Sequence, residues 1–270
     1  MLYLVATPIG NLGDLSPRAI ETLSAVDVIY CEDTRHTGLL LNHFNIKKPT
    51  RSLHTHNERE RTEEVVAALK DGRDVAYVSD AGMPGVSDPG AMLVEACQRE
   101  NLPHTVIPGA SAAVIAAVLS GLPPQPFSFF GFLPRESAPR RIMLDAIAPI
   151  RHQVILYESP HRVQATLKDL YDRFGDGPAA VLRELTKKFE TVVTGSLSEL
   201  IERFSEEPKG ECVIAFIPGQ KDETEAPDLD ETLRALLETE SVKDAAAIAA
   251  ERLSLPKKDV YRRALELKGK

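Results

Sequence analysis

The sequence predicts an α/β protein, because short apolar runs alternate with longer segments of helical periodicity along its first 120 residues. Turns rich in glycine and proline separate the two kinds of segment. Such alternation is typical of a mostly parallel sheet with helices on its faces, in which ligands bind beyond the carboxyl ends of the strands. The strands expected in this first domain, residues 1–120, are 2–6, 26–31, 74–78 and 104–107.

Helices are expected between these strands. Ser16 and Pro17 predict the start of the first one, since serine caps helices well and proline is favoured in the first turn. A second helix is expected to end near His43. The other three are expected at residues 57–70, 88–100 and 110–119, with Asp88 in the cap of the helix that follows it.

The segment GLPPQP, residues 121–126, predicts a stiff linker to a second α/β domain at residues 127–218. Short gaps between some of its strands predict antiparallel pairing there. The expected strands are 127–132, 152–157, 179–182, 191–194 and 211–217, and the expected helices are 140–148, 162–174 and 197–204.

A third composition shift, at the acidic residues 220–228, predicts a small C-terminal helical module at residues 228–270. Its helices are expected at 229–238, 242–253 and 257–267. The turn before the last helix is compatible with a helix-turn-helix-like unit. A helical cap without any nucleic-acid contact is the alternative.

Composition places the chain among ordinary globular proteins, with 43% hydrophobic and 27% charged residues in 270. No apolar run is long enough to cross a membrane, and the first residues do not resemble a signal peptide. Cys31, Cys97 and Cys212 are far apart and lack metal-ligand spacing. We therefore expect buried thiols in a reducing cytoplasm, and no metal.

The formal net charge of −8 argues against indiscriminate binding to nucleic acid, which requires many phosphate contacts. Local basic surface remains available from clusters of arginine and lysine at residues 135–141, 187–188 and 257–263. Solvated helix faces are the alternative interpretation of each cluster.

One loop indicates a ligand site most clearly. SDAGMPGVSDPG, residues 79–90, joins an expected strand to an expected helix, and its three glycines and two prolines shape the backbone for close approach to a ligand. Other loops follow strands elsewhere: TPIGNLGDL, CEDTR, PGASAA, YESPHR and RELTKKF. The first of these has neither GxGxxG nor GxxxxGK[ST] spacing, which gives little support to a dinucleotide or ATP site. Phe132, beside a loop, is placed to stack on a base.

These residues alone leave three classes of function open. One is a group-transfer enzyme whose cofactor lies between two domains. Another is a Mg²⁺-dependent phosphohydrolase that uses Glu32, Asp33, Asp80 and Asp88 as ligands. The third is a non-catalytic RNA-binding assembly factor.

The loops together resemble those of the RsmI family, which are 16S rRNA (cytidine-2′-O)-methyltransferases of the tetrapyrrole methylase superfamily. The resemblance rests on six motifs in the same order, runs from residue 1 to about 218 and extends to the helical tail: ATPIGNLGDLSPRA, CEDTRHT, SDAGMPGVSDPG, PGASA, YESPHR and RELTKKFE. It implies two α/β domains with S-adenosylmethionine in the cleft between them, and a homodimer. It also implies methylation of a decoding-region cytidine on the assembled 30S subunit. A precorrin-type tetrapyrrole methyltransferase is the runner-up.

Matching the motifs assigns roles to residues of this chain. The cofactor residues implied are Pro8, Ile9, Gly10, Asp80, Ala81, Gly82, Met83, Ser111, Ala112, Tyr157, Glu158, Val213 and Ala215. The catalytic residues come instead from charged groups at the predicted cleft edges. There we expect Asp33 or Glu184 to accept the proton of the 2′-hydroxyl, and Arg35 and Lys187 to steady the developing alkoxide or neighbouring phosphates. For RNA binding we expect Arg135, Arg140, Arg141 and Arg162.

Overall fold

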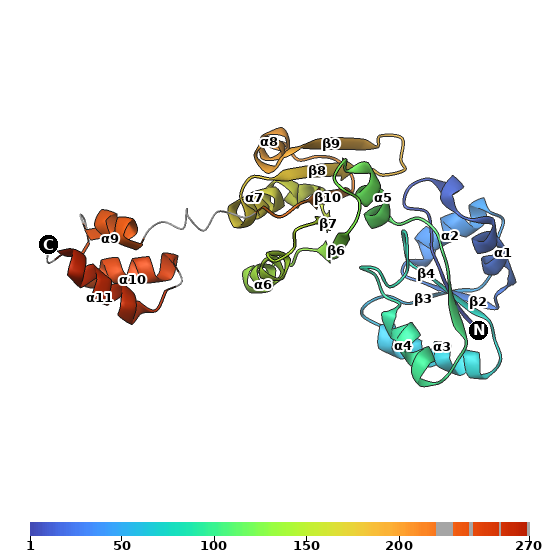
Figure 1. Cartoon of the computed structure of the whole chain (residues 1–270). Coiled ribbons are helices and arrows are strands. Elements are labelled where there is room, and N and C mark those ends of the chain that lie inside the picture. Colours follow the sequence, from blue (N-terminus) through green and yellow to red (C-terminus); the bar gives the residue numbers. More distant parts are fainter. Residues whose placement is uncertain (220–228, 238–239, 254, 269–270) are drawn as a thin grey trace. The chain divides into compact units, whose positions relative to one another are not determined.

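The computed structural model describes residues 1–219, 229–237, 240–253 and 255–268, which fall into two compact units, Met1–Gly219 and Gln220–Lys270. The expected acidic linker lies outside the described residues. Within the first unit the strands form two five-stranded sheets, one before and one after residues 120–126 (Figure 1). The predicted α/β class is confirmed.

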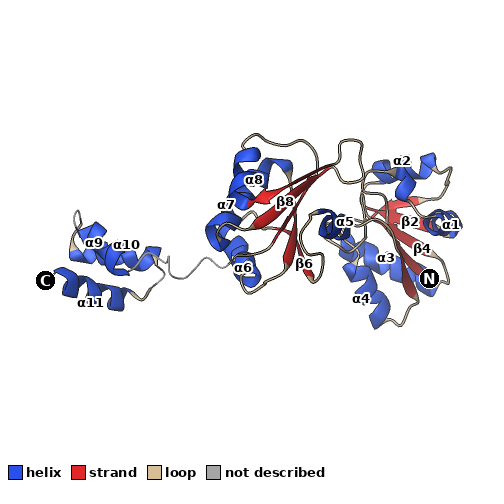
Figure 2. Ribbon diagram, turned by 45° about the horizontal axis from the view of Figure 1, so that its top comes forward, coloured by secondary structure: helices blue, strands red, loops and turns tan. Residues whose placement is uncertain are grey.

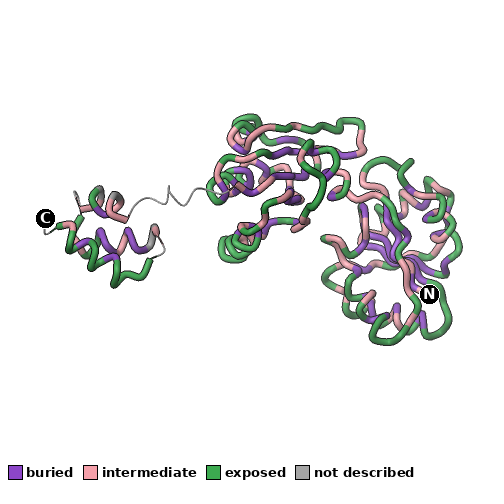
Figure 3. Tube along the Cα trace, viewed as in Figure 1, coloured by how far each residue is buried: buried purple, intermediate pink, exposed green. Residues whose placement is uncertain are grey.

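The first sheet is entirely parallel and has the strand order β3-β2-β4-β1-β5. Its central strands are buried on both faces, as the continuous apolar runs predict (Figure 3). The strands are β1 (Leu2–Val5), β2 (Val28–Cys31), β3 (Thr50–Ser52), β4 (Val75–Val78) and β5 (His104–Ile107). The sequence did not reveal β3, because this short edge strand reads Thr-Arg-Ser and has no apolar residue.

Helices cover both faces of this sheet (Figure 2). On one face, α1 (Pro17–Ala25) and α2 (Thr34–His43) pack against Ile29 and Val78. On the other, α3 (Glu58–Lys70) and α4 (Ala91–Arg99) pack against alternate residues of the same strands. The loops at the carboxyl ends of the strands therefore remain available at one edge.

The second sheet has the order β6-β7-β10-β8-β9 and is antiparallel except for the β6–β7 pair. The predicted antiparallel pairing of residues near 180 and 193 is confirmed. The strands are β6 (Phe127–Phe132), β7 (Gln153–Glu158), β8 (Pro178–Arg183), β9 (Thr191–Ser196) and β10 (Cys212–Phe216). One face packs against α6 (Ser137–Ile147), α7 (Val163–Phe174) and α8 (Leu197–Arg203).

The opposite face of the second sheet is covered by α5 (Ala112–Leu119). The alternating pattern predicts this helix in the first domain, because it follows β5. Its alanines, such as Ala113 and Ala116, instead pack against Ile155 and Ala215. Small side chains allow this close approach of helix and sheet, and α5 thereby extends the core of the second sheet.

The C-terminal unit is a three-helix cluster with its own core. Its helices are α9 (Leu229–Leu237), α10 (Val242–Arg252) and α11 (Lys257–Lys268), as expected. Leu233, Ala249 and Val260 are fully buried at its centre. None of the helices in the described residues of either unit is long and apolar enough to cross a membrane.

Candidate active site

The loops after β1 and β4 are joined at the edge of the first sheet. Thr7 and Gly82 exchange two backbone hydrogen bonds of 2.9 and 3.1 Å. Gly82 has a φ of +81°, and a Cβ there would lie 3.2 Å from Cγ2 of Ile9. We call the loop after β4, residues 79–90, the central loop. It needs glycine at position 82, both for its backbone conformation and for its contact with the loop after β1.

A cavity of about 350 Å³ lies beside these loops, within the size range of small-molecule sites. Loops from both sheets line it: Ile9, Ala81, Gly82, Met83, Val86, Ser87, Asp88, Ser111, Ala112, Phe132, Tyr157, Glu158, Ser159, Pro160, Glu211, Cys212 and Val213. We call it the first cavity. Most of the residues predicted to bind the cofactor are among them.

Four predicted cofactor residues lie elsewhere. Pro8, Gly10 and Asp80 line a neighbouring hollow described below, and Ala215 is buried between the second sheet and α5. Ala215 follows the β10 residues that line the cavity, but it lies deeper in the core. The structure therefore brings the predicted set to one region without placing every member on one surface.

Aromatic side chains form one wall of the first cavity. The rings of Phe129 and Phe132 contact the Tyr157 ring edge to face, with centroids 4.7 and 5.6 Å away. The Tyr157 hydroxyl accepts a 3.1 Å hydrogen bond from the backbone N–H of Ala113, at the start of α5. Burial raises the pKa of Tyr157, so the hydroxyl stays protonated. Phe132 and Tyr157 thus present apolar ring surface to the cavity in a fixed position, which suits a planar ring.

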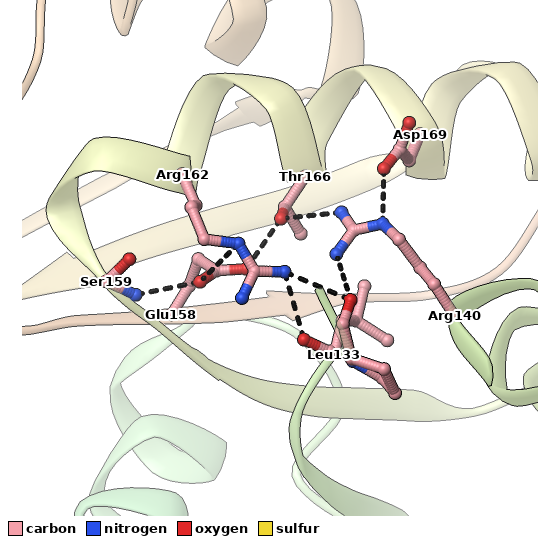
Figure 4. Close-up of polar contacts among 8 residues, drawn as sticks. Leu133, Arg140, Glu158, Ser159, Arg162, Thr166 and Asp169 are labelled. Atoms are coloured by element: carbon pink, nitrogen blue, oxygen red, sulfur yellow. Dashed lines mark hydrogen bonds and ion pairs between the residues drawn. The ribbon is translucent and has the colours of Figure 1, made fainter. Parts of the chain in front are cut away.

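Glu158 is also buried in this wall, and its carboxylate is satisfied by the protein itself (Figure 4). It accepts hydrogen bonds from the backbone of Ser159 at 2.8 Å and from the hydroxyl of Thr166 at 2.6 Å. The Nε of Arg162 lies 3.6 Å from it. Arg162 also donates to the carbonyls of Leu133, at 2.9 Å, and Pro134.

Arg140 belongs to the same network (Figure 4). It donates to the Asp169 carboxylate at 2.5 Å, to the Thr166 hydroxyl at 2.9 Å and to the Pro134 carbonyl at 3.2 Å. Its side chain is only 13% exposed. Arg135 and Arg141 are exposed. Of the four predicted RNA-binding arginines, two thus have structural partners that the sequence did not indicate, and their contact with RNA stays a prediction.

A second cavity, of about 370 Å³, adjoins the first and shares Ile9, Ala81 and Glu211 with it. Its other lining residues come from the loop after β1, the start of α2, the central loop and the loop after β8: Thr7, Pro8, Gly10, Leu12, His36, Leu39, Leu40, Asp80 and Lys187.

Lys187 is the main cation of the second cavity. Its ammonium lies 2.9 Å from Glu184 and 2.8 Å from Glu211. Burial opposes the charge, but these two bonds prevail and raise the pKa of Lys187. The same ion pair lowers the pKa of Glu184. Glu184 is therefore a weaker proton acceptor than an ordinary glutamate, and its predicted role as the base stays a prediction.

Asp33 and Arg35 line neither cavity. Asp33 caps α2 by accepting a 2.8 Å bond from the Arg35 N–H, and it pairs with the Arg35 guanidinium at 2.8 Å. These bonds hold the pKa of Asp33 well below its usual range. In the structure both residues stabilise the N-terminus of α2. Their catalytic role stays a prediction.

The cap of α4 lies within the predicted segment, residues 88–90, but Asp88 itself does not form it. The cap of α4 is Gly90 and involves no side chain, whereas Asp88 lines the first cavity. Burial, together with the charge of Asp80, raises the pKa of Asp88 to about 6. Burial and the nearby Asp88 raise the pKa of Glu32 to about 7. Among the described residues no three His, Cys, Asp or Glu side chains are arranged to hold a metal ion, so these carboxylates form no ligand set there.

Solved structures of the same fold include two kinds of enzyme. Diphthine synthase has a TM-score of 0.62 at 16% identity, over 80% of this chain and 88% of its own. Uroporphyrin-III-C-methyltransferase from Thermus thermophilus has a TM-score of 0.59 at 22% identity, over 80% and 94%. A further structure of the Thermus enzyme, complexed with S-adenyl homocysteine, has a TM-score of 0.55 at 20% identity, over 79% and 96%. These likenesses confirm the fold.

Family models match both units of the chain. The model described as Tetrapyrrole (Corrin/Porphyrin) Methylases covers residues 1–201, and the RsmI C-terminal HTH domain covers residues 223–268. Proteins named ribosomal RNA small subunit methyltransferase I are similar over their whole length. That of Synechocystis sp. is 46% identical, over 100% of this chain and 99% of its own, and that of Vibrio cholerae is 45% identical, over 100% and 96%. The chain therefore belongs to the tetrapyrrole methylase family and, within it, to the RsmI family that its loops resemble.

Proposed function

We propose that this protein transfers a methyl group from S-adenosylmethionine to the RNA of the small ribosomal subunit. The observation that carries the proposal is the first cavity, which the loops shared with the RsmI family build between the two sheets. The name of the full-length relatives, ribosomal RNA small subunit methyltransferase I, supports the choice of substrate.

The residues of the first cavity fit this cofactor. A Cβ at Gly109 would lie 2.8 Å from that of Ala6, so glycine there keeps two ligand loops in contact. The wall around Tyr157 suits an adenine ring, and the carboxylate of Asp88 suits a ligand with positive charge. When bound, S-adenosylmethionine supplies a methyl group on a sulfonium, so that the C–S bond breaks with its electron pair kept by sulfur while a C–O bond forms.

The chain's own residues then have two tasks: to orient the acceptor hydroxyl and to accept its proton. A well-oriented acceptor accounts for much of the rate when the leaving group is already activated. Lys187 and Arg35 are proposed to steady the developing negative charge, and Asp33 or Glu184 to take the proton. The lowered pKa of both carboxylates implies that orientation contributes more than strong basicity.

The finer assignment is methylation of the 2′-oxygen of a decoding-region cytidine by a cytoplasmic homodimer acting on the assembled 30S subunit. Exposed apolar side chains on α5, Val114 at 53% and Val118 at 66%, support a contact with a second copy. The acidic net charge supports a folded particle over naked RNA, because it leaves little general attraction for phosphates. We expect weak affinity for free 16S rRNA.

Mass spectrometry of small-subunit rRNA tests this function. Cells that lack the gene should lose one ribose methyl on a decoding-region cytidine, and a plasmid copy should restore it. Unchanged rRNA in those cells would contradict the proposal. If purified protein then methylated a porphyrinogen in place of rRNA, the runner-up would replace it.

A further inference from the structure

We propose that the second cavity is the subsite for the target nucleotide itself, with Lys187 as its cation and Gly10 as the residue that makes room for Lys187. The inference rests on the proposed function and goes beyond it by naming where an RNA nucleotide enters. Its class of ligand is a single unstacked nucleotide, with base, ribose and phosphate.

Position favours this assignment. A methyl acceptor must come within about 3 Å of the carbon that is transferred, so its site must border the cofactor site. The second cavity shares three lining residues with the first. Two other hollows of the described residues, one lined by residues 183–191 and 207–210 and one by residues 56–63, share none.

The lining also has the mixed chemistry that an extruded nucleotide requires. Leu12 and Leu39 expose 42% and 71% of their surface and so offer apolar surface to a base at this cavity. His36 and Asp80 add hydrogen-bonding groups. Enzymes that act on an unstacked nucleotide hold its base between apolar side chains and bind its edges through such polar groups.

Lys187 supplies the positive charge for a phosphate or ribose oxygen. Its partner Glu211 is 74% exposed, and an ion pair with so exposed a partner contributes little stability. A phosphate is therefore able to replace Glu211, while Glu184 continues to hold the ammonium from the other side.

Gly10 sets the position of Lys187. A Cβ added at Gly10 would lie within van der Waals overlap of the Lys187 stem, 2.9 Å from Cε and 3.1 Å from Cδ. Any other residue at position 10 would force the Lys187 side chain to shift from this position. The family resemblance implied that Gly10 binds the cofactor, whereas this contact assigns to it the seating of the lysine.

The test compares Gly10→Ala and Lys187→Met with Gly38→Ala, a control whose new Cβ meets no atom within 4 Å. Each variant is measured by calorimetry with S-adenosylhomocysteine and by steady-state methylation of small subunits. For Gly10→Ala and Lys187→Met we expect the KM for subunits to rise about tenfold or more, with affinity for S-adenosylhomocysteine within twofold of wild type. Lys187→Arg should recover part of the loss, and Gly38→Ala should behave as wild type.

Two outcomes overturn the inference alone: wild-type KM in both variants, or a tenfold loss of S-adenosylhomocysteine affinity, which would place Lys187 in the cofactor site. Wild-type protein that methylates no small subunit at all would instead remove the proposed function. Equal melting temperatures of the variants and wild type serve as the check on folding.

Discussion

Two half-buried carboxylates, Glu32 and Asp88, stand out among the side chains of the active-site edge. Burial disfavours the charged form of both and is the main reason why each has a raised pKa. The negative charge of Asp88 adds to the shift of Glu32, and that of Asp80 adds to the shift of Asp88. The fully buried Tyr77 lies close to them, and burial together with the charge of Glu32 raises the pKa of its hydroxyl. Negative charge thus accumulates beside the first cavity, where a cationic ligand would reduce its cost.

The raised pKa of Glu32 predicts how stability changes with pH. Because its pKa is about 7 in the folded protein and near 4.5 in the unfolded chain, the folded state holds more protons between these values. The free energy of unfolding should therefore fall as the pH rises through this window. Glu32→Gln removes the titration, and its gain over wild type should be about 1 kcal/mol larger at pH 8 than at pH 5, after allowance for solvent screening.

Urea unfolding at both pH values measures the difference. Glu63→Gln on the exposed side of α3 is the matched control and should change stability by less than about 0.5 kcal/mol, equally at both pH values. A Glu32→Gln effect that is the same at pH 5 and pH 8 would contradict the interpretation.

The ends of β6 and β7 depend on the network of Glu158, Arg162, Thr166 and Arg140 (Figure 4). These side chains tie the carbonyls of Leu133 and Pro134 to α7, next to the aromatic wall of the first cavity. Buried networks of charged groups are costly to break, because each remaining partner is left unpaired. The geometry of the wall thus depends on side chains that lie behind it.

Arg140 and Arg141 offer a direct comparison of a structural and a surface arginine. Arg140→Ala should lower the free energy of unfolding by about 2 kcal/mol, since it leaves Asp169 and the Pro134 carbonyl without this donor. Arg141→Ala should change it by less than about 0.5 kcal/mol, and we expect it to weaken binding to small subunits. Chemical denaturation and subunit binding measure the two effects. Equal stability of both variants would remove the structural role of Arg140.

Most helices and strands could be predicted from periodicity and turn residues. The predictions failed where contacts with other elements determine the structure of a segment or its place in the fold. Thr50–Ser52 becomes a strand only because β2 offers it a partner, and α5 is apolar on nearly all sides, so its sequence does not say which sheet it covers. The cofactor loops were identified because glycine at positions such as Gly82 has a backbone reason. The proposed role of Gly10 could not be predicted in this way, because its contact with Lys187 joins residues 177 positions apart in the sequence.

The two units of the molecule differ in what they contain. Both sheets and both cavities lie within Met1–Gly219, whereas Gln220–Lys270 has a separate core and carries Lys257, Lys258 and Arg262 on α11. A protein with a net charge of −8 has few places where an RNA particle is attracted. We expect the lysines at the start of α11 to form one of them.

Truncation after Gly219 should therefore leave S-adenosylhomocysteine affinity unchanged within twofold and weaken binding to small subunits about tenfold. The full-length variant Lys257→Glu/Lys258→Glu should lose affinity in the same direction and should show a smaller salt dependence. Calorimetry and subunit binding at two salt concentrations measure this. Truncated protein that binds subunits as tightly as the full chain would show that the first unit recognises them alone.

The three buried thiols allow local opening to be measured separately on each layer of the first unit. Cys31 and Cys97 lie on opposite faces of the first sheet, and Cys212 lies in the second, at the edge of the first cavity. Burial raises the pKa of all three, that of Cys212 to about 11, so a thiol reagent must wait for local opening. The labelling rates of the three cysteines thus report how often each face opens in the unmodified protein. We expect a ligand in the first cavity to slow the labelling of Cys212 alone.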